Sequence, residues 1–395
     1  MRNLLFLSCF IALLSCKHQE SGVASIDSKG CVEIPVDLSS PQIASIEKNL
    51  STFFYVKLET NPESVIGTID KVFCDDGKIF VFDKKMESVL IFDMKGNYLY
   101  KIASKGKGPG EYLMLEDINL NIAKKRLEIP DIFRKRVLFF NYQGQFTGEL
   151  KFNKQIFSYI TSNKEGEFLI NNQIRLNEKT IDYFSNKGKL SKSYFEPDYP
   201  EDDYNYFSTL QNPVATNANR MYFLLHMNES IYAVENGKCK EAYRFVFGKN
   251  RYSDIKDNYF KSGGGVDKML SFYNNYKLPL TIDNLFMTDK MFTLRMILFP
   301  HCADFFYDKT SGKNLLLKNW KSDKSFSFIP NQCVGSNKDY FISFVPSESV
   351  MNFFEELNKN NLRKIDPKGY DEIEALYNKT KLEDNPVLMF FQMKL

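Results

Sequence analysis

Residues 89–112, VLIFDMKGNYLYKIASKGKGPGEY, hold two apolar runs joined by a Gly turn, followed by a second loop dense in glycine. The first run, VLIFD, has counterparts at five later places: VLFFN at 137, IDYFS at 181, IYAVE at 231, DFFYD at 304 and VLMFF at 387. A turn glycine follows each of the first five runs, namely Gly96, Gly144, Gly188, Gly237 and Gly312. A polar turn and a strand-like segment precede each run, as in CDDGKIFVFD and GSNKDYFISF. The repeat therefore predicts six antiparallel units of four short strands.

The spacing of the runs indicates the architecture. The first three intervals are 48, 44 and 50 residues, which match the period of a β-propeller blade, and the last two, 73 and 83, indicate insertions. The sixth unit lacks its fourth strand, whereas a spare strand-like segment, STFFYVKLE, lies at residues 51–59. Pairing of that segment with the last unit would close the ring and cover two exposed edges. We expect an all-β fold, a six-bladed β-propeller of four-stranded antiparallel blades over residues 51–395.

The Gly-rich loop SKGKGPGEY could be a phosphate-binding loop or a connection between blades. A phosphate-binding loop needs the spacing G-x-x-x-x-G-K-[ST] between a strand and a helix. Here that spacing fails, Pro109 intervenes and no helical pattern follows. We interpret Gly106, Gly108 and Gly110 as residues that allow unusual backbone angles in a tight crossover from the first blade to the second.

Two insertions interrupt the period. Residues 248–284 fall between the fourth and fifth units, and residues 346–383 fall inside the sixth. Within the second insertion, SESVMNFFEELNKNNLRKI begins with a serine cap and has apolar residues at helical spacing, and DEIEALYNKTKL has a similar pattern. We expect a small helical insertion that docks on the propeller, and both insertions are candidate contacts for a partner.

The N-terminus has the features of an export signal. Arg2 precedes an apolar run that is too short to span a membrane, and the run ends in LLSC at Cys16. We expect a lipoprotein signal peptide at residues 1–15, a lipid on Cys16 and a tether with an N-terminal segment at residues 16–50. The alternative is an ordinary signal peptide with an incidental cysteine. The lipid would hold the protein in the bacterial envelope, at the outer membrane, facing the periplasm or the cell surface.

Composition narrows the class of protein further. The chain has 36 Phe and 22 Tyr among its 395 residues, which favours strands. Its net charge of +3 argues against a nucleic-acid-binding protein. The cysteines beyond the signal are scattered without C-x-x-C spacing, so they indicate neither a disulfide framework nor a zinc site.

Three segments resemble a known family, the six-bladed, NHL-like β-propeller lipoproteins of Bacteroides-type bacteria. They are VKLETNPESVIGTIDKV at 56–72, GKGPGEY at 106–112 and LEDNPVLMFF at 382–391, so the resemblance spans nearly all of the expected mature chain. It implies the propeller fold and an envelope location. The resemblance carries no agreed activity and no catalytic motif.

Basic residues recur in the loops between the second and third strands of the first three units. They are Lys84, Lys85, Arg134, Lys135, Arg136 and Arg175. One interpretation is a site for an anionic group such as an acidic sugar or a carboxylate, which arginine can bind through two hydrogen bonds. The alternative is a solvated rim, because Lys and Arg side chains are usually exposed. His226 and His301 fall in the same class of loop and are candidates for a ligand-binding or catalytic pair.

Acidic residues on or beside the inner strands could hold a metal ion in the central channel, as in some six-bladed hydrolases that this fold resembles. The candidates are Asp70, Asp117 and Asp289. Calcium requires six to eight oxygen ligands that converge on one point, so a plain structural role for the three carboxylates is the alternative.

No string typical of a catalytic triad, a zinc protease or a nucleophile elbow is present. We therefore expect a non-enzymatic, lipid-anchored propeller that binds a glycan, a peptide or a protein partner and needs no cofactor. The alternative is an envelope hydrolase or lyase that uses a divalent metal, such as Ca²⁺, in the central channel.

Overall fold

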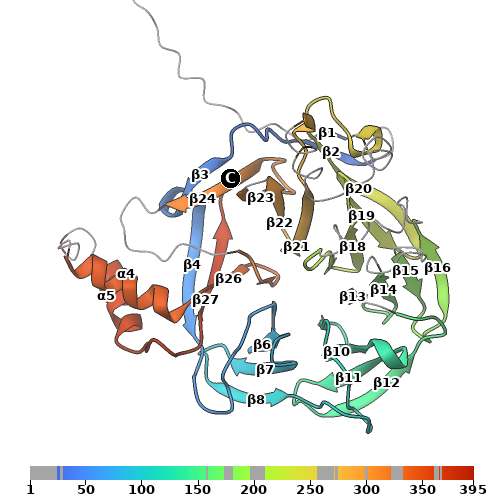
Figure 1. Cartoon of the computed structure of the whole chain (residues 1–395), viewed down its shortest axis with the longest axis horizontal. Coiled ribbons are helices and arrows are strands. Elements are labelled where there is room, and N and C mark those ends of the chain that lie inside the picture. Colours follow the sequence, from blue (N-terminus) through green and yellow to red (C-terminus); the bar gives the residue numbers. More distant parts are fainter. Residues whose placement is uncertain are drawn as a thin grey trace, which may run out of the picture.

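The computed structural model describes residues 25–26, 30–156, 159–172, 181–195, 210–255, 271, 275–298, 301–321, 332–359, 364 and 367–395. Within these ranges the chain is dominated by short strands, and the strands are ordered around a common centre (Figure 1). The arrangement is that of a β-propeller. Arg175 and Cys16 lie outside the described residues.

The strands group in chain order into antiparallel units, each with its first strand nearest the centre and its later strands successively further out (Figure 1). Units 1 to 3 comprise β5 (Lys71–Asp75), β6 (Lys78–Asp83), β7 (Ser88–Asp93) and β8 (Tyr98–Ile102); β9 (Asn119–Asn121), β10 (Arg126–Asp131), β11 (Arg136–Asn141) and β12 (Phe146–Lys151); and β13 (Tyr159–Ser162), β14 (Phe168–Asn171), β15 (Ile181–Phe184) and β16 (Leu190–Tyr194). Units 4 to 6 comprise β17 (Val214–Asn217), β18 (Arg220–Leu224), β19 (Ser230–Glu235) and β20 (Lys238–Val246); β21 (Thr281–Met287), β22 (Met291–Leu298), β23 (His301–Asp308) and β24 (Asn314–Lys321); and β25 (Gly335–Ser336), β26 (Phe341–Val345) and β27 (Val387–Met393).

The N-terminal segment supplies strands to three of these units. β1 (Ser25–Ile26) and β2 (Val32–Pro35) extend unit 4, where β2 runs parallel to β20. β3 (Gln42–Ser45) runs parallel to β24 of unit 5 and leads through α1 (Ile46–Asn49) into β4 (Leu50–Lys57). β4 pairs antiparallel with β27, which is the pairing predicted from residues 51–59. The folded part thus begins before residue 51, the expected start of the propeller.

Close stacking of the units explains the abundance of aromatic residues. Almost every residue of a second or third strand is buried, as in β7, because neighbouring units cover both faces of each sheet. Phe80 of unit 1 meets Tyr142 of unit 2 with ring centroids 5.0 Å apart, and Phe245 of unit 4 meets Phe305 of unit 5 at 5.4 Å. These broad side chains fill the wedge between adjacent sheets.

The antiparallel strands define two faces of the molecule. We call the face with the turns between first and second strands and between third and fourth strands the turn face. The opposite, crossover face carries the loops between second and third strands and the connections between units. At the turn face Gly96 has φ +86°, and a Cβ there would overlap the carbonyl oxygen of Lys57. A Cβ on Gly188 would overlap the Lys151 carbonyl oxygen in the same way, so glycine is required at these two turns for contact between neighbouring units.

The Gly-rich loop connects β8 to β9 across the crossover face, as predicted. Of its three glycines only Gly110 has a positive φ, +74°. Gly106 and Gly108 instead leave room for the Glu111 carboxylate, which accepts a hydrogen bond from the Gly108 N–H at 2.6 Å. The prediction of unusual backbone angles is therefore wrong for Gly106 and Gly108.

Both expected helices of the second insertion are present, as α4 (Ser347–Lys359) and α5 (Pro367–Tyr377). They form a hairpin outside the ring beside unit 6 (Figure 1). Val350, Phe354 and Ile373 pack against Val387 of β27, so the apolar stripe docks the hairpin on the propeller. Of the first insertion, residues 256–270 and 272–274 lie outside the described residues. No described helix is long and apolar enough to cross a membrane.

Candidate functional site

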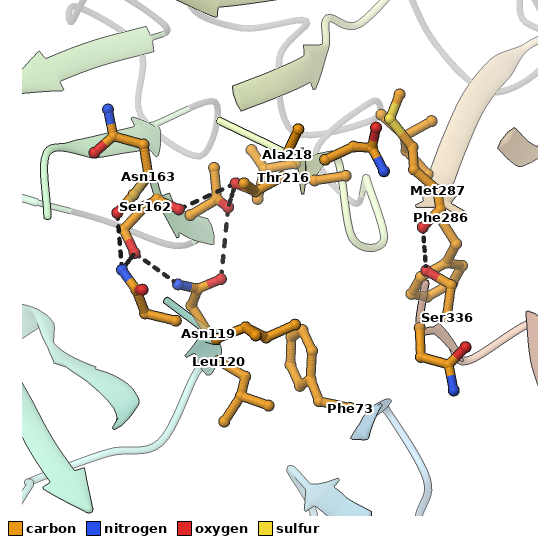
Figure 2. A pocket seen from close by; sticks show the side chains of 18 of the residues that line it. Phe73, Asn119, Leu120, Ser162, Asn163, Thr216, Ala218, Phe286, Met287 and Ser336 are labelled. Atoms are coloured by element: carbon orange, nitrogen blue, oxygen red, sulfur yellow. Dashed lines mark hydrogen bonds between the residues drawn. The ribbon is translucent and has the colours of Figure 1, made fainter. Parts of the chain in front are cut away.

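A pocket of about 390 Å³ lies at the centre of the ring. Six stretches of the chain line its wall, mainly first strands and the turns that follow, at residues 71–73, 119–123, 160–164, 214–218, 285–287 and 336–338. Because most of these residues lie at the turn ends of the first strands, the pocket opens on the turn face. Figure 2 shows polar side chains of units 2 to 4 on one side and Phe286, Met287 and Ser336 on the other.

The polar side is built around a buried carboxylate. Glu128 accepts hydrogen bonds from Asn119 Nδ2 and from Ser162 Oγ, both at 2.7 Å, and its second oxygen accepts one from Arg126 Nε at 2.8 Å. Asn121 Nδ2 donates to Ser162 Oγ at 2.7 Å. Units 2 and 3 are joined through this network, and each pocket side chain in it has a fixed orientation.

A second set of polar groups continues the wall into units 4 and 5. The hydroxyls of Thr161 and Thr216 share a hydrogen bond of 2.6 Å, and Thr216 also donates to the Ser162 carbonyl at 3.2 Å. Asn217 Nδ2 donates to the carbonyl of Thr288 at 3.2 Å. The pocket therefore presents amides and hydroxyls that are already held in place and can accept further hydrogen bonds through their free lone pairs.

Apolar side chains complete the pocket. Phe73 of β5 is half-buried and points into the space between the two sides (Figure 2). Leu120, Phe286 and Met287 contribute further apolar surface. A pocket that combines apolar walls with a few fixed polar groups has the features of a small-molecule site.

An ion pair lies deeper in the channel. Lys71 Nζ is 2.5 Å from Asp117 Oδ1, and Asp117 Oδ2 accepts the N–H of Ile160 at 2.9 Å. Both charged side chains are almost fully buried. Burial raises the pKa of the Asp117 carboxyl, and the nearby Lys71 ammonium opposes that rise. The ion pair and the hydrogen bond to Ile160 link units 1, 2 and 3, so Asp117 has a structural role.

The three aspartates predicted to hold a metal are not brought together. Asp70 accepts hydrogen bonds from Thr68 Oγ1 at 2.6 Å and from the Lys84 N–H at 2.8 Å, on the crossover face. Asp117 is paired with Lys71, and Asp289 lies at the rim of the pocket. Within the described ranges no three His, Cys, Asp or Glu side chains lie close enough to hold one metal ion. The structure therefore does not bring Asp70, Asp117 and Asp289 together, and a metal in the channel stays a prediction.

Five of the predicted basic residues are described, and they lie on the crossover face, away from the pocket mouth. Arg136 is buried and ion-paired with Asp131 at 2.9 Å and with Glu149. Arg136 also donates to the Glu111 carbonyl at 2.9 Å, and Arg134 donates to the carbonyls of Gly106 and Glu111 at 3.3 Å. Both guanidinium groups thus hold the Gly-rich crossover.

The other candidates also lie outside the pocket wall. Lys84 pairs with Glu116 at 2.7 Å, whereas Lys85 is exposed. His226 is buried in the loop after β18, and His301 is the exposed first residue of β23 in the next unit. Among the described residues that were proposed for ligand or metal binding, only Asp289 contributes to the pocket.

One signal in the sequence could have indicated the pocket mouth. An asparagine stands at or directly after the end of the first strand in four hairpins, at Asn121, Asn163, Asn217 and Asn337. Asn121 Oδ1 accepts the Lys124 N–H at 3.0 Å and Asn337 Oδ1 accepts the Tyr340 N–H at 2.7 Å, so these side chains shape the turns. The repeated asparagine marks the rim on which the pocket opens.

Residues 31–392 match the model of a family described as a domain of unknown function, DUF4934. The chain belongs to the DUF4934 family. No curated protein matches this DUF4934 chain.

Three solved structures illustrate what this DUF4934 protein is similar to. An exported protein from Bacteroides fragilis NCTC 9343 is 15% identical with a TM-score of 0.70, over 92% of this chain and 100% of the other. A member of the duf4221 family from Bacteroides vulgatus ATCC 8482 is 11% identical with a TM-score of 0.48, over 87% and 97%. Virginiamycin B lyase from Staphylococcus aureus is 14% identical with a TM-score of 0.37, over 68% and 74%. At 15% identity, the similarity to the exported Bacteroides fragilis protein shows a shared fold and nothing more.

Proposed function

We propose that this DUF4934 protein is a lipid-anchored, six-bladed β-propeller of the bacterial envelope that binds a neutral glycan in its central pocket. In this function the protein binds its ligand and catalyses no reaction. The observation that carries it is the pocket itself, in which fixed amides and hydroxyls face Phe73 and other apolar side chains.

The number of blades depends on how the largest sheet is divided. That sheet has eight strands, but its two halves are joined only by the parallel pair Gly335 and Val72. We count the halves as separate blades, which makes six with the other four sheets. The pairing of β4 with β27 supports an NHL-like ring closed by the N-terminal segment.

The envelope location rests on the N-terminal sequence. The apolar run that ends in LLSC is typical of a lipoprotein signal, with Cys16 as the lipidated residue. The similar fold of an exported Bacteroides protein supports export.

The chemistry of the pocket favours a glycan over other ligands. A sugar ring has an apolar face that can pack on an aromatic side chain and a rim of hydroxyls that can pair with amides and hydroxyls. Asn119, Ser162 and Thr216 supply such polar groups opposite Phe73 (Figure 2). The buried charges Lys71 and Asp117 neutralise each other, so the inner wall favours a neutral ligand.

Isothermal titration calorimetry with neutral oligosaccharides, acidic oligosaccharides and short peptides tests the proposal. We expect binding of a neutral oligosaccharide and a loss of about 1.5–3 kcal/mol on Phe73→Ala, which removes the aromatic wall. Phe133→Ala is the matched control, because Phe133 is exposed on the crossover face. Peptide binding that depends on Phe73 would replace the glycan with a peptide, and glycan binding unaffected by Phe73→Ala would contradict the assigned pocket.

A further inference from the structure

The crossover face of units 1 and 2 has a composition unlike that of an ordinary solvated rim. Four large apolar side chains are exposed there: Val65 (54%), Met86 (55%), Met114 (36%) and Phe133 (58%). Lys85 and Lys135 are exposed among them, and neither makes an ion pair with any described residue. We call these six residues the basic-apolar patch. Clustered apolar side chains mixed with cations are typical of a surface that binds a partner or a membrane.

The loops that carry the patch are bound to one another. Lys84 pairs with Glu116 at 2.7 Å, which ties the loop after β6 to the crossover before β9. Arg134 donates to the carbonyls of Gly106 and Glu111, which ties that crossover to the loop after β10. Met86 lies directly over Gly67, in the connection before β5. The loops that carry the patch are therefore held side by side.

Carboxylates beside the patch are already engaged. Asp70 accepts hydrogen bonds from Thr68 and from the Lys84 N–H, and Glu63 pairs with Lys101 at 2.9 Å. Among the described ion pairs Asp70 has no cation, so Lys85 and Lys135 face one unpaired carboxylate and outnumber it. A surface of this kind is complementary to anionic lipid headgroups, with apolar side chains that can enter the interface.

The first described residues of the N-terminal segment lie at the crossover end of unit 4. β20 follows the turn at Gly237, so it runs from the turn face to the crossover face, and β2 runs parallel to it. β1 is antiparallel to β2, so its first residue, Ser25, lies at the crossover end. Eight residues separate Ser25 from Cys16, a span of roughly 30 Å when extended. A lipid on Cys16 would keep the crossover face within that distance of the membrane.

We propose that the basic-apolar patch lies on the surface of an anionic phospholipid bilayer and so turns the pocket on the opposite face away from the membrane. The proposal uses the lipid anchor of the proposed function but does not depend on what the pocket binds. The lipid holds the chain at the membrane, and a basic and apolar contact beside it would fix which face of the propeller lies on the bilayer.

Vesicle co-sedimentation of residues 17–395, which contain every described strand and helix but no anchor, tests the patch by itself. The vesicles contain phosphatidylethanolamine with about one third phosphatidylglycerol, and vesicles of pure phosphatidylcholine are the neutral comparison. We expect binding to the anionic vesicles that weakens with added salt. Lys85→Gln with Lys135→Gln should lower the partition coefficient at least tenfold, because each lysine near the surface contributes roughly fivefold.

Met86→Ser with Phe133→Ser should lower the same partition coefficient by a similar factor. The matched controls are Lys95→Gln with Lys187→Gln, two exposed lysines of the turn face, and Ile43→Ser with Met94→Ser, two exposed apolar residues outside the patch. Thermal melting shows that each variant is folded. Lack of binding to anionic vesicles at low salt, or equal losses in patch and control variants, would overturn the proposal and indicate a protein partner instead. Neither result bears on glycan binding, which calorimetry measures in the absence of lipid.

Discussion

At the scale of single residues, the structure gives several charged side chains a role that differs from the one expected from the sequence. Arg134 and Arg136 appear in the sequence as free cations in a loop, and they were natural candidates for an anion site. Their actual partners include the carbonyls of Gly106 and Glu111, which lie more than twenty positions upstream. A sequence read alone cannot pair a side chain with a distant backbone oxygen, so the structural role was not predictable.

Asp283 is a buried carboxyl with a pKa far from its ordinary value. It lies on β21 opposite Arg295, which pairs in turn with Asp304 on the next strand. Its Oδ1 has no hydrogen-bond partner among the described residues, and its Oδ2 accepts only a long bond from the Gln211 N–H at 3.5 Å. Burial raises the pKa of Asp283 to about 7, and Arg295 only partly offsets that effect. The folded state therefore binds this proton more tightly than the unfolded state.

The contribution of Asp283 to stability should fall as the pH rises. Below about pH 4 the carboxyl is protonated in both states, and between about pH 4 and 7 only the unfolded chain loses the proton, which favours unfolding. We expect Asp283→Asn to remove this slope, so that its free energy of unfolding matches the wild type at pH 4 and exceeds it at pH 8. Urea titrations across that range measure the difference, with the exposed Asp339→Asn as control. If the stability of the Asp283→Asn variant changed with pH as the wild type's does, Asp283 could not be the source of this pH dependence.

At the scale of elements, the repeated strands and turns were predictable because their causes are local. A β-rich apolar run followed by a turn glycine is visible within ten residues, and Gly96 and Gly188 are needed where neighbouring units touch. The parallel strands β2 and β3 were missed because they are short, lie outside the repeat and pair with partners about two hundred residues or more away. The helices α4 and α5 were predictable from their own periodicity.

Two glycines of unit 1 allow the contact between units to be measured. Gly96 and Gly77 both have positive φ, +86° and +73°, but a Cβ on Gly96 would overlap the Lys57 carbonyl, whereas one on Gly77 would meet nothing within 4 Å. We expect Gly77→Ala to cost about 1 kcal/mol of stability for backbone strain alone. Gly96→Ala should cost clearly more, because β4 must also move. Chemical denaturation of the two variants compares the costs, and equal losses would show that the contact between β4 and unit 1 contributes little.

At the scale of the whole molecule, the two faces have different roles in this account. The turn face carries the mouth of the pocket, and the crossover face carries the basic-apolar patch and the end of β1 at Ser25. The pocket itself could not be predicted from the sequence, because each unit contributes only a few residues to its wall and those residues are dispersed over more than two hundred positions. These residues come close together only when the ring forms. The repeat predicts the class of fold but not the positions of individual side chains.

The central claim is that the pocket of the propeller holds a neutral glycan. The most direct measurement is a crystal structure of the protein soaked with the oligosaccharide that binds most tightly in calorimetry. The account predicts electron density for a sugar ring against Phe73, within hydrogen-bond distance of Asn119, Ser162 or Thr216. Sugar density at another surface, with the central pocket holding only solvent, would contradict it.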